Sequence, residues 1–183
     1  MSRIFPALIL SVAMTGGAVA DDVAPDKLVD SLNGVFGKHA KTRGSHAKGL
    51  CIKGDFAPTS DAPALSKAPF LAANVPVLGR FSFGGGNPKA SDKAKSPRGL
   101  AVRFDPDGAA PTDFVFLSAP IFFARTPAEV VGFLEARVPG ADGKPDPAKV
   151  KAFTEAHPWT AKQAAWVAAK PVPASYAGLP YFS

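Results

Sequence analysis

Apolar residues recur along this chain with two different periods, first that of a helix and then that of strands. Within residues 24–38, apolar side chains stand three or four positions apart, which predicts an amphipathic helix. From residue 49 onward, short apolar runs bounded by proline and glycine predict strands. The predicted strands cover residues 49–57, 75–83, 99–105 and 113–118, with a short helix at 61–67, and the inward residues of the first helix are Leu28, Val29, Leu32, Val35 and Phe36.

The last third of the sequence returns to the helical period. Thr126 is followed by Pro127 and by Glu129, which is typical of a capped helix start, and this helix is predicted to run to about Arg137. Asp146 and the proline after it begin another helix in the same way. The inward residues of the first are Val130, Val131, Phe133 and Leu134, a third helix at 158–169 carries Trp159 and Trp166, and an extended segment follows it.

The first twenty residues have the pattern of a secretory signal peptide. Arg3 supplies a positive charge, the run from 4 to 14 is almost entirely apolar, and Ala18-Val19-Ala20 offers small residues for cleavage. The run is too short to cross a bilayer, and the alternative is a buried N-terminal helix. We therefore expect residues 1–20 to be removed and residues 21–183 to form one periplasmic or secreted domain, with no membrane association after cleavage.

Composition and charge narrow the possible functions. The chain has 183 residues, of which 46% are hydrophobic and 20% charged, an ordinary globular composition with enough length for one core. A net charge of +6 suits nucleic acid, a membrane surface or an anionic cofactor. The basic residues are scattered without a dense run, so a basic soluble surface is favoured over a nucleic-acid module. Cys51 is the only cysteine, which excludes an internal disulfide and a cysteine-based metal site.

His46 is the leading candidate for chemistry. It lies between Arg43 and a lysine among the small residues of "RGSHAKG", which would let a flat ligand approach, and a histidine can accept and return a proton near neutral pH. The alternative is a structural histidine. His39 fits the end of the first helix and His157 a turn, and these separated histidines have no acidic partner at ligand spacing, so no metal site is predicted. The glycine run at 84–86 lacks the lysine and hydroxyl residue of a phosphate loop.

Four ordered segments together are similar to those of one family. "RGSHAKG", "VPVLGRFS", "SPRGLAVRF" and "DFVFLSAPIFFARTP" resemble, in order and spacing, the haem catalase family, and more narrowly its exported branch, the catalase-related peroxidases. The tail segment "KPVPASY" resembles that branch too, so the likeness covers about residues 24–183. It implies an α+β fold, namely the N-terminal half of the catalase-type antiparallel β-barrel with flanking helices. It also implies haem b as the cofactor.

The resemblance assigns a role to several residues. His46 matches the histidine over the distal side of the haem iron, which moves a proton between the two oxygens of a peroxide. Ser82 matches a serine that bonds the other ring nitrogen and fixes its tautomer. Arg43 and Arg80 match arginines that hold the haem propionates, and Phe122 matches an aromatic residue of the peroxide channel.

Several positions depart from the catalase pattern. Leu117 stands where catalases place an asparagine beside the distal histidine, and the related peroxidases also lack that asparagine. Val130 stands where catalases stack a phenylalanine on haem. The family's iron ligand is a tyrosine four residues after an arginine, whereas neither Tyr176 nor Tyr181 follows such an arginine. The family's chains continue past the point that matches Ser183, so the sequence is expected to be a truncated, N-terminal half.

Two functional hypotheses follow. The first is a haem-dependent peroxidase that reduces hydrogen peroxide or organic peroxides with an unidentified electron donor, and that uses His46 and Ser82 in catalysis. The second is a truncated, secreted β-rich remnant that binds haem weakly or not at all. A nucleic-acid module is a weaker third hypothesis, because aromatic residues are not interleaved with basic ones.

Overall fold

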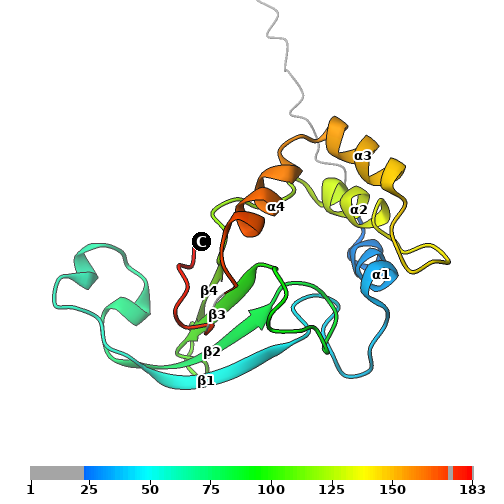
Figure 1. Ribbon diagram of the computed structural model, residues 1–183. Helices are drawn as coiled ribbons and strands as arrows, with labels where there is room; N and C mark the ends of the chain where they lie inside the picture. The colour runs from blue at the N-terminus through cyan, green and yellow to red at the C-terminus, as the bar shows by residue number, and fades with distance from the viewer. Residues whose placement is uncertain (1–22, 173–174, 183) are drawn as a thin grey trace, which may run out of the picture.

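The computed structural model describes residues 23–172 and 175–182, and the predicted signal peptide lies outside them. The architecture is α+β, as predicted, and each strand begins and ends within one residue of its predicted bounds (Figure 1). In chain order the elements are α1 (Pro25–Phe36), β1 (Gly49–Phe56), the 3-10 turns Ala62–Ala64 and Pro69–Leu71, β2 (Val75–Phe83), β3 (Arg98–Phe104), β4 (Thr112–Leu117), α2 (Pro127–Glu135), α3 (Pro147–Ala156) and α4 (Thr160–Ala169).

The strands form one antiparallel sheet in the order β1-β2-β3-β4. In its register Ser82 lies opposite Gly49 on one side and Gly99 on the other. Because successive side chains of a strand point to opposite faces, the sheet has two distinct faces. We call the face that carries Arg80, Ser82 and Leu117 the histidine face, since His46 contacts it, and the opposite one the Phe81 face.

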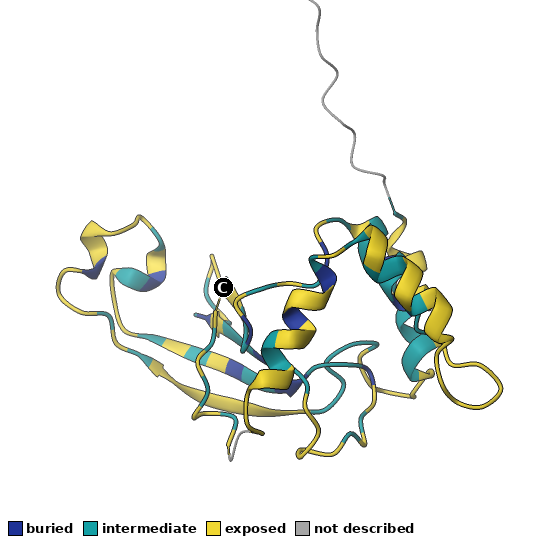
Figure 2. Cartoon of the chain, turned by 45° about the horizontal axis from the view of Figure 1, so that its top comes forward, coloured by how far each residue is buried: buried dark blue, intermediate teal, exposed yellow. Residues whose placement is uncertain are grey.

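An aromatic cluster forms the main packing on the Phe81 face. Phe56, Phe104 and Phe114 come from three different strands, and Phe70 from the second 3-10 turn packs among them. The rings of Phe70 and Phe104 stack with their centroids 4.4 Å apart, and both side chains are buried. This cluster ties the long excursion between β1 and β2 back to the sheet. By contrast, β1 is exposed along nearly its whole length as an edge strand (Figure 2).

The helices begin where the sequence pattern places them. The Thr126 hydroxyl accepts a hydrogen bond from the backbone N–H of Glu129 at 3.2 Å, and the Asp146 carboxylate accepts one from Ala148 at 2.8 Å, so both predicted caps are confirmed. Glu129 reaches back to the N–H of Arg125, one residue before the cap. Helices α1 and α2 pack together beside the sheet (Figure 1).

Three details of the prediction were wrong. Residues 61–67 hold only one 3-10 turn, Ala62–Ala64, because Ala68 is extended before a proline and the few residues upstream cannot support a longer helix. Val29 was expected to face inward, yet it is 49% exposed. The small Ser31 takes the buried place on α1, and its hydroxyl donates to the Lys27 carbonyl at 2.8 Å. Helix α4 begins at Thr160, two residues later than expected.

Among the residues that the structure describes, no helix is long and apolar enough to cross a membrane. Within the same residues, no three histidine, cysteine, aspartate or glutamate side chains are grouped so that they could hold a metal ion.

Candidate functional site

His46 lies in the loop that joins α1 to β1, in a backbone conformation that few residues other than glycine adopt. Its φ is 52°. One terminal nitrogen of Arg80 donates to the backbone oxygens of His46 and Ala47, at 2.9 and 3.2 Å. The N–H of Ala47 donates to the carbonyl of Gly85 at 3.1 Å. These bonds hold the left-handed conformation in place, since such strain persists only where the surroundings over-determine it.

The imidazole of His46 forms a hydrogen bond with Ser82, as predicted. Its Nδ1 lies 2.9 Å from the hydroxyl oxygen of Ser82, and that serine is buried. When Nδ1 carries the proton, it donates a hydrogen bond to the serine oxygen, and Nε2 is left with its lone pair available. A hydrogen bond to one ring nitrogen thus sets which nitrogen is the base.

Two glycines make this close packing possible. A Cβ added to Gly99 would lie 2.6 Å from the hydroxyl oxygen of Ser82 and 3.0 Å from Nδ1 of His46. A Cβ added to Gly49 would lie 2.6 Å from the guanidinium carbon of Arg80. The two 2.6 Å distances are shorter than a real Cβ allows, and the 3.0 Å distance is unusually tight, so the histidine and the arginine each lie over a residue without a side chain. Neither glycine stood out in the sequence.

Burial and two positive charges lower the pKa of His46. Burial is the larger cause, because it disfavours the charged imidazolium, and the charges of Arg80 and then Arg43 act in the same direction. The ring is therefore neutral at pH 7, as a proton acceptor has to be.

An apolar cavity of about 300 Å³ lies beside the imidazole. Leu117 and Phe122, two positions that the sequence singled out, are among its lining residues. Gln163 of α4 donates from its side-chain amide to the carbonyl of Ile121 at 2.7 Å and so holds the segment that carries Phe122. The lining side chains that the sequence analysis missed include Phe36, Phe123, Phe133, Leu134 and Gln163.

Three other predicted site residues, namely Arg43, Phe122 and Val130, form no hydrogen bond with His46 or Ser82 among the contacts described. Arg43 is exposed, near enough for its charge to act on His46. Phe122 is 52% exposed although it lines the cavity. Val130 is half-buried on α2 and is not among the cavity-lining residues. The structure thus brings His46, Ser82 and Arg80 into one hydrogen-bonded group.

Both tyrosines lie on the other side of the sheet. The rings of Tyr176 and Tyr181 pack against Phe81, at centroid distances of 6.4 and 5.9 Å. The side chain of Phe81 points away from the face that carries Arg80 and Ser82, because these residues alternate along β2. Burial and then the bond to Asp92 also raise the pKa of Tyr176 to about 12, far from that of a phenolate ligand. Neither tyrosine is therefore placed to share a ligand with His46.

Comparisons with known proteins agree on one family. The family model for catalase matches residues 10–183. A catalase-related peroxidase from Synechococcus elongatus is 40% identical over 96% of this chain, and one from Mycolicibacterium paratuberculosis is 41% identical over 69% of it. A solved bacterial catalase covers 85% of this chain with a TM-score of 0.60 and 23% sequence identity.

The solved catalase and the elements described above define an α+β protein with a partial catalase fold. The chain belongs to the catalase family. It spans about half the length of the Synechococcus relative, 52%, namely its N-terminal half, and 39% of the mycobacterial one.

The residues on the histidine face fit one wall of a haem site. A neutral imidazole beside an apolar cavity suits the distal side of a flat macrocycle, and two nearby guanidinium groups suit its carboxylates. Arg80 uses one terminal nitrogen on backbone oxygens, and a guanidinium has further N–H donors to offer. Within the described residues, the tyrosines that could ligate iron from the opposite side are on the wrong face.

Proposed function

We propose that this chain contributes the peroxide-binding wall of a haem b peroxidase, which reduces hydrogen peroxide or organic peroxides with an external electron donor. The observation that carries the proposal is the buried bond between His46 and Ser82 at the edge of an apolar cavity. The names of two relatives, both catalase-related peroxidases, support the same reaction class.

In the proposed reaction His46 moves a proton. Its Nε2 is left as the base when Nδ1–H donates a hydrogen bond to Ser82, and it takes a proton from the nearer oxygen of the peroxide and returns it to the leaving oxygen. Haem, when bound, supplies the electrons that cleave the oxygen–oxygen bond. A positioned acid–base group of this kind is worth about 10²–10⁴ in rate.

The cavity wall favours a peroxidase over a dismutating catalase. Leu117 lines the cavity where the resemblance to catalases would place an asparagine. Leucine offers no hydrogen bond to orient a second hydrogen peroxide molecule, so electrons for the second half of the cycle would come from another donor. The apolar Phe122 on the same wall is compatible with an organic peroxide.

Arg43 and Arg80 are proposed to hold the haem propionates. Their combined positive charge already lowers the pKa of His46, and a bound carboxylate near them would partly cancel that effect. Haem binding should therefore raise the pKa of His46 through the propionates, although burial by the macrocycle would oppose the rise. We also propose a periplasmic or secreted location, from the signal-like residues 1–20.

The positions of the two tyrosines support a second candidate function. Because Tyr176 and Tyr181 pack on the Phe81 face, the chain alone would hold haem weakly, and a non-catalytic remnant is the competing function. A chimera separates the two. Residues 23–182 replace the matching half of the Synechococcus relative, whose own second half is kept, and haem content and peroxide-dependent oxidation of a dye are measured.

Retained haem and activity in the chimera, with both low in the chain alone, support the proposal. In the chimera His46→Gln should keep haem and lose about 10²–10⁴ in rate. The matched control is His39→Gln, since His39 is exposed and only caps α1 by bonding the Phe36 carbonyl at 2.9 Å. If His46→Gln turns over peroxide as fast as the parent chimera, His46 is a structural histidine and the proposed function is wrong.

A further inference from the structure

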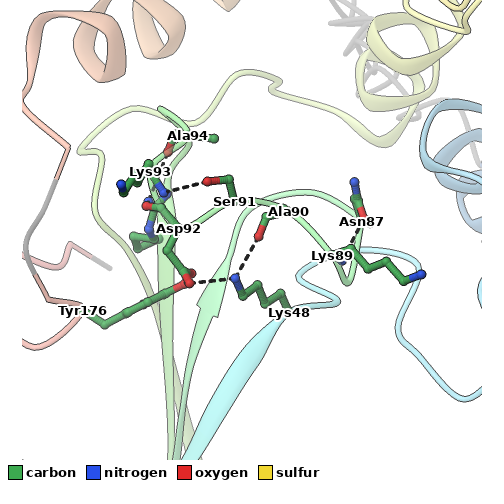
Figure 3. Close-up of polar contacts among 10 residues, drawn as sticks. Lys48, Asn87, Lys89, Ala90, Ser91, Asp92, Lys93, Ala94 and Tyr176 are labelled. Atoms are coloured by element: carbon green, nitrogen blue, oxygen red, sulfur yellow. Dashed lines mark hydrogen bonds and ion pairs between the residues drawn. The ribbon is translucent and has the colours of Figure 1, made fainter.

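A carboxylate on the loop between β2 and β3 joins two distant segments of the chain. One oxygen of Asp92 accepts from Nζ of Lys48 at 2.8 Å, and the other accepts from the hydroxyl of Tyr176 at 2.7 Å. Nζ of Lys48 also donates to the carbonyl of Ala90, again at 2.8 Å. Figure 3 shows both side chains reaching the same carboxylate from opposite sides. We call Lys48, Asp92 and Tyr176 the Asp92 clasp.

The loop that carries Asp92, between β2 and β3, is held in place by the buried side chain of Arg98. Arg98 is 1% exposed and stacks its guanidinium on Phe83, 4.1 Å from the ring centroid. From there it donates to the backbone oxygens of Asp92 and Ala94, at 2.9 and 3.2 Å. The backbone that carries the Asp92 carboxylate is therefore held in place by Arg98. In a typical surface ion pair, by contrast, the entropy lost in ordering the two side chains cancels most of the electrostatic attraction.

Lys48 connects the clasp to the histidine. It stands two residues after His46, and its carbonyl accepts from the N–H of Phe83 at 2.9 Å where β1 begins to pair with β2. The residue between them bonds to Gly85, which lies in the same loop as Asp92. Because His46 has a left-handed backbone, its ring position depends on such flanking anchors.

Tyr176 brings the C-terminal segment into the same network. Its carbonyl accepts from the hydroxyl of Tyr181 at 2.8 Å, so the two tyrosines are tied together over Phe81. Phe182 then pairs with Leu117 at the end of β4 through two backbone bonds of 2.8 Å. Residues 175–182 thus reach the sheet at Leu117 and the histidine loop through Asp92.

We propose that Asp92 is a positioning residue that acts in two directions. Through Lys48 it holds the His46 imidazole against Ser82, and through Tyr176 it makes that position depend on the docking of residues 175–182. The role in catalysis rests on the proposed function of His46, but the coupling itself belongs to this chain.

The test is a proton NMR titration of the histidine ring signals in the chain without haem. The His46 signal is assigned by its loss in His46→Gln, and the variants are Asp92→Asn and Tyr176→Phe. The sign of the change is informative. Removing the negative charge of Asp92 would by itself lower the pKa of His46, whereas releasing the ring into solvent raises it toward the ordinary value near 6.5.

We expect Asp92→Asn to raise the pKa of His46, Tyr176→Phe to raise it less, and Asp92→Glu to restore much of the parent behaviour. The matched control is Asp113→Asn, which removes a surface carboxylate that accepts two bonds from Arg103, at 2.8 and 2.7 Å, and should leave the His46 titration unchanged. An unchanged or lowered pKa in a folded Asp92→Asn variant overturns the proposal.

A rise in Asp92→Asn without one in Tyr176→Phe refutes the coupling to residues 175–182. If Asp92→Asn does not fold, as judged by amide dispersion, Tyr176→Phe decides alone, because it removes one hydroxyl and keeps every charge. The measurement needs neither haem nor peroxide. A failure here therefore leaves the chimera result standing, and an inactive chimera leaves this coupling standing.

Discussion

Adding one methyl group at Gly99 should displace the His46 ring. The new Cβ would lie 2.6 Å from the hydroxyl oxygen of Ser82, and 3.0 and 3.1 Å from Nδ1 and Cε1 of His46. All three distances lie inside 3.4 Å, below which few real Cβ contacts occur, and the 2.6 Å contact cannot be kept. Since Gly99 is buried in β3 between two strands, the backbone has little room to yield, so the serine and the imidazole must part.

The expected loss of stability in Gly99→Ala follows from two effects. Overpacking of this kind costs about 1–3 kcal/mol, and the lost hydrogen bond to a buried hydroxyl about 1 kcal/mol. A gain of roughly 0.5–1 kcal/mol opposes them, because alanine restricts the unfolded chain more than glycine does. We expect the free energy of unfolding to fall by about 1–3 kcal/mol, and the pKa of His46 to rise as the ring gains solvent.

Urea denaturation and NMR titration of His46 measure the two effects. The control is Gly54→Ala on β1, where the added Cβ would meet only Cγ2 of Val77, at an ordinary 3.8 Å, and should be neutral or slightly stabilising. If Gly99→Ala is as stable as Gly54→Ala and His46 titrates as in the parent, the packing argument for this site is wrong.

Three further predictions follow. The pKa of His46 is lower in the folded state than in the unfolded state, so the free energy of unfolding should decline as the pH falls below about 6.5. In urea denaturation His46→Gln should flatten this decline, and an unaltered dependence on pH would contradict the prediction. Arg80→Ala should lower the free energy of unfolding by about 1.5–3 kcal/mol, because the carbonyls of the left-handed turn lose a charged donor, whereas Arg43→Ala, an exposed change, should be near neutral in the same assay. In haem titrations of the chain alone, Tyr181→Phe should leave the absorption spectrum unchanged, and a spectrum of tyrosinate-ligated haem that disappears in this variant would refute the assignment of faces.

The sequence by itself was sufficient for the local elements. Strand bounds followed from apolar runs between prolines and glycines, and the starts of α2 and α3 from Thr126 and Asp146, because caps and side-chain periodicity depend on residues within a few positions of each other. The same locality explains the error at residues 61–67, where too few residues precede the next proline to extend a single 3-10 turn. Four motifs in order were also enough to indicate the catalase family.

Only the tertiary structure gives the physical reason why distant side chains meet. The resemblance had paired Ser82 with His46, but the hydrogen bond forms because strand register places Ser82 opposite Gly99, and no local signal in the sequence encodes that register. The alternation of β2 likewise separates the tyrosines from His46, whereas the sequence showed only that neither follows the arginine of the family's ligand motif. Asp92 looked like one charge among many in a polar loop, and its role emerged only when antiparallel pairing and the returning C-terminal segment brought Lys48 and Tyr176 to the same carboxylate. Contacts between distant segments depend on how the strands pair and on which face each residue lies, and both are properties of the assembled sheet.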